Sequence, residues 1–97
     1  MPENIYQLEL SPAAKRDLKK LPNEIQKSIV FEHLASILEN PFLSSKPLVG
    51  ALKGERAYHF GRNPEYRIIY FVEQNLITVT IIGTRENIYK RAKRRKK

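Results

Sequence analysis

The sequence predicts an α+β domain, in which a helical hairpin packs on an antiparallel sheet. Residues 5–10 alternate between apolar and polar side chains, which is typical of a strand with one buried face. Residues 12–39 then carry apolar side chains at helical spacing, interrupted at Pro22. Residues 56–82 return to alternation and are rich in β-branched and aromatic side chains. This order, one strand, two helices and three strands, separates the helices from most of the sheet and so favours an α+β fold.

The two helices have clear boundary signals. Ser11-Pro12 combines a good N-cap with a residue suited to the first helical position. Pro22 ends this first helix or opens the next, and the second helix is expected over residues 23–39. Asn40-Pro41 should stop it, because proline cannot continue a helix. Two helices joined by so short a link form a helical hairpin.

The three later strands are expected at residues 56–60, 65–73 and 76–82, connected as an antiparallel meander after a loop over residues 42–54. The strand at 65–73 has apolar side chains on both faces, which predicts a central position in the sheet. Gly83-Thr84 should end the last strand, and a short helix should follow from residue 85. With the helices on one face, the other face is left for a partner or a substrate.

The charge of the chain is concentrated at its end. The protein has 97 residues, enough for one domain, and a net charge of +8. Seven of its 18 basic residues lie within residues 90–97, which leaves eleven basic against ten acidic residues elsewhere. We therefore expect one domain over residues 1–89 and a basic tail over residues 90–97. Such a tail attracts polyanions, above all nucleic acid; the alternative is a solvated charged segment with no ligand.

Composition also excludes several classes of function. There is no cysteine, which rules out disulfides and thiolate zinc sites. With two histidines and no G-x-x-x-x-G-K-[ST] motif, metal catalysis and P-loop nucleotide hydrolysis are not expected. The chain has no apolar run of membrane-spanning length and no signal-peptide pattern at its start. We expect a cytoplasmic protein without a cofactor, a metal or a membrane partner.

Five phrases in a fixed order give the chain a resemblance to a known family. They are residues 10–22 (LSPAAKRDLKKLP), 40–42 (NPF), 52–54 (LKG), 65–70 (EYRIIY) and 82–89 (IGTRENIY). Over residues 6–92 the chain resembles the RelE/ParE superfamily, the toxins of type II toxin–antitoxin modules. The resemblance implies a β-α-α-β-β-β fold and an antitoxin partner. In the RelE branch it implies metal-free cleavage of mRNA on the ribosome. ParE-type relatives instead poison DNA gyrase. A third alternative is a catalytically inactive member of the family that is retained because it binds its partner.

Cleavage of RNA without a metal needs cations near the phosphate and groups that move protons. The resemblance implies that Arg67 binds the phosphate and stabilises the transition state; the alternative is an ion pair with Glu65 or Glu73. It gives Arg85 a phosphate or leaving-group role, against the alternative of an ion pair with Glu86.

Two further side chains complete the predicted catalytic set. The resemblance makes Tyr89 the aromatic side chain that holds the RNA, whereas simple packing is the alternative. His59 lies close to the position at which RelE carries a lysine, and imidazole is well suited to proton transfer near neutral pH. A structural role is the alternative for this histidine. His33 is expected at the edge of the core.

Other basic residues are predicted to bind RNA rather than to catalyse its cleavage. They lie in the loops and in the tail, and a solvated surface charge is the alternative for each. These residues are Lys53, Arg62, Lys90, Arg91, Lys93, Arg94 and Arg95.

Overall fold

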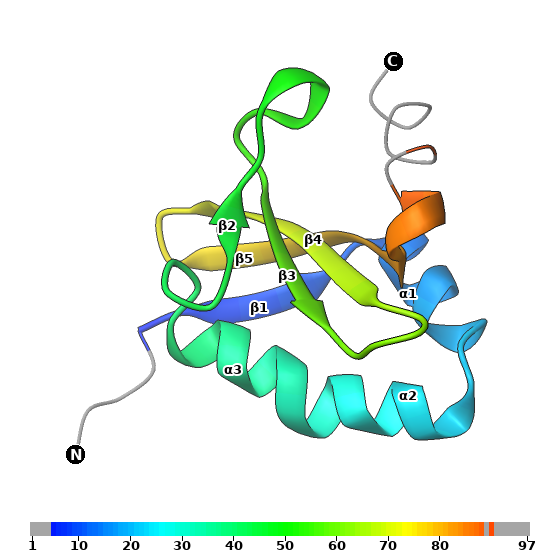
Figure 1. Ribbon diagram of the computed structural model, residues 1–97. Coiled ribbons are helices and arrows are strands. Elements are labelled where there is room, and N and C mark those ends of the chain that lie inside the picture. The colour runs from blue at the N-terminus through cyan, green and yellow to red at the C-terminus, as the bar shows by residue number, and fades with distance from the viewer. Residues whose placement is uncertain (1–4, 89, 91–97) are drawn as a thin grey trace.

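A computed structural model describes residues 5–88 and residue 90 of the chain. Its five-stranded sheet has the order β1-β5-β4-β3-β2, and helices pack against one face (Figure 1). The predicted α+β class is therefore confirmed. No helix in the described part of the chain has the length and apolar character needed to cross a membrane.

The expected meander is formed by β3 (Arg56–Phe60), β4 (Tyr66–Glu73) and β5 (Leu76–Thr84), which pair antiparallel in that order. β4 lies between two neighbours, as its two apolar faces predicted. Two features were not predicted. β1 (Gln7–Leu10) pairs parallel to β5, so the sheet is mixed. A two-residue strand, β2 (Lys46–Pro47), lies within the predicted loop and pairs with β3.

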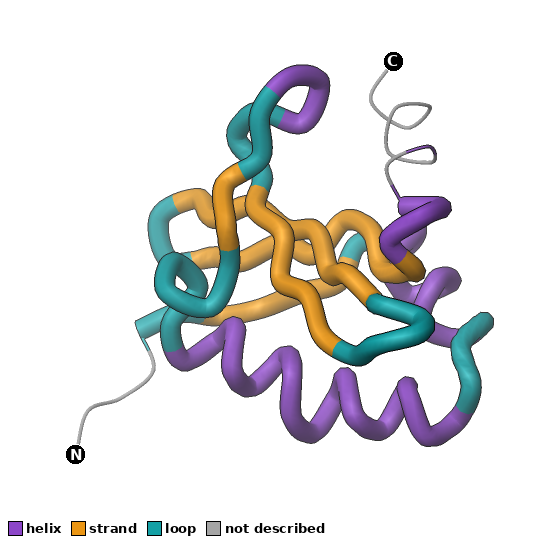
Figure 2. Tube along the Cα trace, viewed as in Figure 1, coloured by secondary structure: helices purple, strands orange, loops and turns teal. Residues whose placement is uncertain are grey.

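The first helix, α1 (Pro12–Lys19), begins where the sequence predicts, and the Ser11 side chain accepts a hydrogen bond from the Ala14 N–H at 3.1 Å. The second expected helix contains α2 (Asn23–Ser28), a π-helical turn over Ile29–His33 and α3 (Leu34–Glu39). Figure 2 shows these three parts as one continuous helical segment. The extent of this helix is thus confirmed, whereas its π-helical turn was not predicted.

The main core lies between the helices and the sheet. Ile29 and Ile37 from the helical segment pack with Ile68 and Tyr70 of β4. The Tyr70 hydroxyl is satisfied because it donates to the Pro41 carbonyl at 2.7 Å. This core holds β4 firmly, so the side chains that alternate to its other face have a rigid support.

The opposite face of the sheet is only partly open. A second, smaller cluster covers its middle, where Ile69 and Ile81 pack against Leu52 from the loop and Ile88. Residues 85–88 are helical, as predicted. The predicted end of the last strand is wrong, however, because β5 continues through Gly83 and Thr84, which pair with the start of β4. Pairing with a neighbouring strand outweighs the low strand preference of glycine.

Candidate functional site

A cleft of about 550 Å³ lies at one end of the sheet, on the partly open face. β3 ends here, β4 begins here and β5 ends here, because the three strands are antiparallel. The lining residues therefore come from segments far apart in the sequence. They are His59, Gly61, Arg62, Asn63, Pro64, Glu65, Thr84, Arg85 and Glu86.

The strand register brings two predicted catalytic residues together. His59 of β3 pairs with Arg67 of β4, and Arg67 pairs in turn with Gly83 of β5. Residues directly opposite each other in an antiparallel pair point to the same face of the sheet. His59, which lines the cleft, and Arg67 are therefore neighbours on one face of the sheet. The residue beyond Arg67, Gly83, has no side chain to cover it.

Glu65 contacts three of the predicted catalytic residues. Its Oε2 accepts a hydrogen bond from Arg67 Nε at 3.0 Å and lies 3.8 Å from His59 Nδ1. Its backbone carbonyl accepts a hydrogen bond from the Arg85 N–H at 2.9 Å. From the sequence, Glu65 was expected only as an alternative ion-pair partner of Arg67, and that ion pair is present. Its position two residues before Arg67 was the one signal for a wider role.

Arg85 stands at the first position of the terminal helical segment, and its exposed side chain lines the cleft. Glu86 lines the same cleft and is exposed as well. Tyr89 lies outside the described residues, so its predicted role stays a prediction. The cleft thus combines Arg85 with Glu65, and Arg67 is hydrogen-bonded to that glutamate.

The turn between β3 and β4 presents Arg62 on the rim of this cleft, where its side chain is exposed. The turn depends on Gly61, which has φ +82°. A Cβ at this position would also lie 3.2 Å from the Pro64 carbonyl oxygen, so glycine is the residue that fits. Arg62 thus lines the same cleft as His59 and Arg85, and its predicted phosphate contact stays a prediction.

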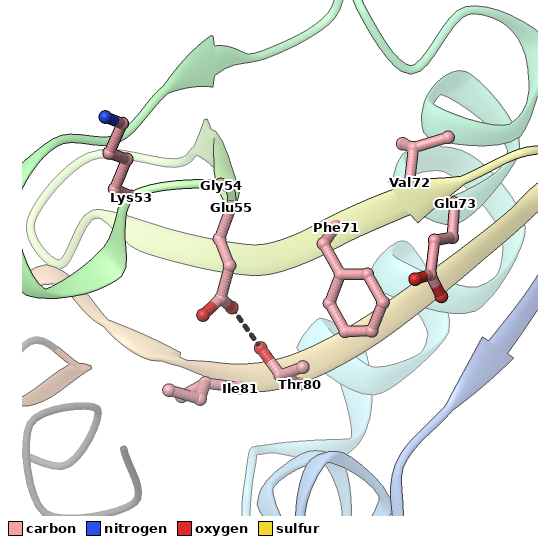
Figure 3. A pocket seen from close by; sticks show the side chains of 8 residues that line it. All are labelled: Lys53, Gly54, Glu55, Phe71, Val72, Glu73, Thr80 and Ile81. Carbon is pink, nitrogen blue, oxygen red and sulfur yellow. Dashed lines mark hydrogen bonds between the residues drawn. The ribbon is translucent and has the colours of Figure 1, made fainter. Parts of the chain in front are cut away.

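Lys53 is placed elsewhere. It lines a second cleft of about 510 Å³, which involves the far half of β4 and the middle of β5 (Figure 3). Figure 3 shows Glu55 directed at Thr80, whose hydroxyl donates to Glu55 Oε1 at 3.0 Å. The structure thus does not bring Lys53 together with His59 and Arg67.

Lys90 is also separated from the cleft. It is exposed and lines a third cavity of about 350 Å³, beside Asp17 of α1 and Thr84. The other predicted RNA-binding residues of the tail, Arg91, Lys93, Arg94 and Arg95, lie outside the described residues. Their role, and the division of the chain into residues 1–89 and a tail, stay predictions.

His33 lies on the helix-covered side of β3, and it is half-buried at the edge of the core, as expected. Its ring stacks on Phe60 with the centroids 3.9 Å apart, and its Nδ1 forms a 2.7 Å hydrogen bond with the Tyr58 hydroxyl. Burial lowers the pKa of His33, against an opposing effect of the nearby Glu32 carboxylate. This histidine therefore belongs to the packing of the helix on β3 and not to the cleft.

The chemistry available in the cleft follows from these residues. Arg62 and Arg85 line the cleft, and Arg67 lies beside it, bonded to Glu65. Their guanidinium groups suit phosphate oxygens because a guanidinium donates two hydrogen bonds in one plane. His59 and the carboxylates offer groups that move protons. Within residues 5–88 and 90, no three histidine, aspartate or glutamate side chains form a group that could hold a metal ion.

The sequence of this chain matches a known family of proteins. The family model described as the ParE toxin of the type II toxin–antitoxin system parDE matches residues 8–89. Toxin RelE of Mycobacterium tuberculosis is 32% identical over 79% of this chain and 76% of its own length. Toxin RelG of the same organism is 31% identical over 89% of this chain and 98% of its own length.

Solved structures agree with these relatives. The chain is similar to the crystal structure of the toxin–antitoxin complex RelBE2 from M. tuberculosis, with a TM-score of 0.72, 26% identity, and coverage of 82% of this chain and 98% of that one. The isolated E. coli RelE toxin has the same fold, with a TM-score of 0.68 and 23% identity over 93% of this chain and 97% of that one. The family model and the relatives cover most of the domain, so this chain belongs to the RelE/ParE superfamily of toxins from type II toxin–antitoxin systems.

Proposed function

We propose that this toxin is a metal-independent endoribonuclease that cleaves mRNA on the ribosome and so inhibits translation. The observation that carries the proposal is the cleft lined by His59, Glu65 and Arg85. Arg67 lies beside it, because Arg67 pairs with His59 across the sheet and donates a hydrogen bond to Glu65. Glu65 also approaches His59 and bonds to Arg85 through its backbone. The relatives named RelE and RelG support the same branch of the superfamily. The ribosome and mRNA are then the substrate partners.

The proposed reaction is attack of a ribose 2′-oxygen on the neighbouring phosphorus. The new 2′-O–P bond forms as the P–O5′ bond breaks, which yields a 2′,3′-cyclic phosphate and a free 5′-hydroxyl. His59 transfers a proton to or from one of these oxygens. Arg67 and Arg85 stabilise the negative charge that builds on the phosphoryl oxygens, where removal of one such donor typically costs about 10²- to 10³-fold in rate. In this proposal Arg62 binds a flanking phosphate and Tyr89 stacks on a base.

A second function is inhibition of DNA gyrase through protein binding. The name of the matching family model, ParE, is the observation in its favour. A catalytically inactive member that retains only its antitoxin is the third alternative. Neither alternative requires cationic and proton-transferring groups to meet in one cleft, and for that reason we favour the nuclease.

The deciding experiment adds purified protein to a translating extract and, separately, to DNA gyrase with plasmid DNA. Primer extension on the extract's mRNA should show new 5′ ends, and these should appear only when ribosomes are present. They should persist when EDTA is added at a concentration that leaves the ribosomes intact. Trapped gyrase–DNA complexes without mRNA breaks would assign the chain to the gyrase branch. The absence of both effects, with growth unaffected by expression, would favour the inactive alternative.

A further inference from the structure

Glu65 joins the parts of the candidate site that come from different strands. Its side chain contacts Arg67 of β4 and approaches His59 of β3, and its backbone bonds to Arg85 at the end of β5. We infer that Glu65 is a positioning residue, whose carboxylate orients His59 and Arg67 for the reaction. This inference rests on the proposed RNA cleavage and adds a residue to it.

The contact with Arg67 fixes the direction of a long side chain. Arg67 Nε donates to Glu65 Oε2 at 3.0 Å, and the two side chains are 21% and 30% exposed. An arginine side chain has many rotamers, and ordering it costs conformational entropy. A bond already present in the free protein removes part of that cost before the phosphate arrives, which is the physical basis of preorganisation.

The approach to His59 concerns the imidazole ring. Its Nδ1 lies 3.8 Å from the carboxylate oxygen, and its side chain is 53% exposed. A carboxylate on that side favours the tautomer with the proton on Nδ1, so Nε2 becomes the nitrogen that exchanges protons with the substrate. Such contacts are often long in a free enzyme and shorten in the complex with substrate.

The hydrogen bond between the Glu65 backbone and Arg85 allows the role of the Glu65 side chain to be tested by substitution. It uses the backbone carbonyl of Glu65, so every side chain at position 65 retains it. Glu65→Gln keeps one acceptor oxygen but loses the negative charge, so it weakens the contacts with His59 and Arg67 and leaves the link to Arg85 unchanged. Glu73 provides a matched control, because it is an exposed glutamate at the opposite end of β4 and does not line this cleft.

The experiment measures single-turnover cleavage of mRNA at increasing ribosome concentration. Glu65→Gln should lower the maximal rate about 10- to 100-fold, by analogy with the loss of a group that orients a metal ligand. The ribosome concentration at half-saturation and the melting temperature should change little, and Glu73→Gln should match the wild type. A maximal rate for Glu65→Gln equal to that of Glu73→Gln would overturn the inference.

Double variants separate positioning from an independent effect. If Glu65 acts through His59 and Arg67, the loss from Glu65→Gln should be smaller when either His59→Ala or Arg67→Ala is already present. If the fold-loss of cleavage rate in both double variants equals the product of the losses in the single variants, the inference is contradicted.

A further measurement does not depend on cleavage. The ¹⁵N chemical shifts of the His59 ring should report a proton on Nδ1 in the wild type and a changed tautomer balance in Glu65→Gln. If the wild type shows this tautomer but cleaves no mRNA, the proposed function fails and the positioning by Glu65 remains. An unchanged ring spectrum in Glu65→Gln would overturn the positioning itself.

Discussion

Asp17 of α1 accepts a hydrogen bond from the backbone N–H of Ile82 in β5, with its Oδ2 3.1 Å away and 65 positions separating the two residues. The last pair between β1 and β5 joins Leu10 to Val79, so the final residues of β5 extend past the end of β1. Helix α1 lies beside this stretch, and Asp17 is only 3% exposed. The helix thereby supports the end of the strand that leads directly to Arg85.

Asp17→Ala should destabilise the fold. The substitution removes a buried, charge-assisted acceptor from the Ile82 N–H, and such bonds contribute about 1.5–3 kcal/mol. Urea unfolding should show a loss of this size in the free energy of unfolding. Asp17→Asn, which keeps a side-chain oxygen, should lose less. Equal losses in the two variants would mean that the hydrogen bond is not the source of the effect.

Arg67→Ala and Arg85→Ala should each abolish toxicity while the fold remains intact. Each removes a cation that would meet charge in the transition state, and the expected loss of cleavage rate is about 10²- to 10³-fold. Neither residue is buried, so truncation leaves no large cavity in the core. Growth assays at equal levels of folded protein, with circular dichroism spectra as the control, measure the effect. Undiminished toxicity in both variants would refute their assignment as catalytic residues.

The stability of the fold should fall in mildly acidic solution because of His33. Burial lowers the pKa of His33 in the folded protein below its ordinary value of 6.5, so the unfolded chain binds a proton more readily. The contribution of this histidine to the free energy of unfolding is therefore fully present above pH 6.5. It is lost as the pH falls from there through the lower pKa that His33 has in the folded protein. His33→Phe should reduce this slope in urea unfolding measured across that range. An identical pH dependence in the variant would exclude His33 as its cause.

Deletion of residues 94–97 should weaken binding to the ribosome without slowing the chemical step. Phosphate contacts add affinity that does not depend on sequence, with a salt slope of about −0.7 to −0.9 per contact. Binding measured across salt concentrations should show lower affinity and a flatter slope, whereas the cleavage rate at saturating ribosome should be preserved. If that rate disappears although the protein is folded, the tail belongs to the active site.

A small antitoxin should neutralise this protein. The relatives include a toxin–antitoxin complex, and this supports a cognate antitoxin for the present chain as well. Expression of the chain alone should arrest growth, and co-expression with the neighbouring small reading frame should restore it. Persistence of the arrest with every adjacent frame would count against a neighbouring antitoxin gene.

Local patterns in the sequence were sufficient for most of the secondary structure. The cap at Ser11 and the stop at Asn40-Pro41 act within one helical turn, and the alternation at residues 66–73 reports which faces of one strand are buried. Interactions between near neighbours dominate such features, so a single sequence contains the signal. The helical segment from residue 23 to 39 was accordingly predicted in its full extent, whereas its π-helical turn was not, because it has no comparable local pattern.

Pairing between distant segments decided the rest. The parallel alignment of β1 with β5, the continuation of β5 through Gly83 and the register of His59 with Arg67 each depend on which backbone groups meet across the sheet. The same pairing separates Lys53 from the cleft and brings Glu65 into contact with three other site residues. The residue types and the family resemblance predicted RNA cleavage and its candidate residues. The register of the strands decided which of those residues share one site, because a shift by one residue would turn each side chain to the opposite face.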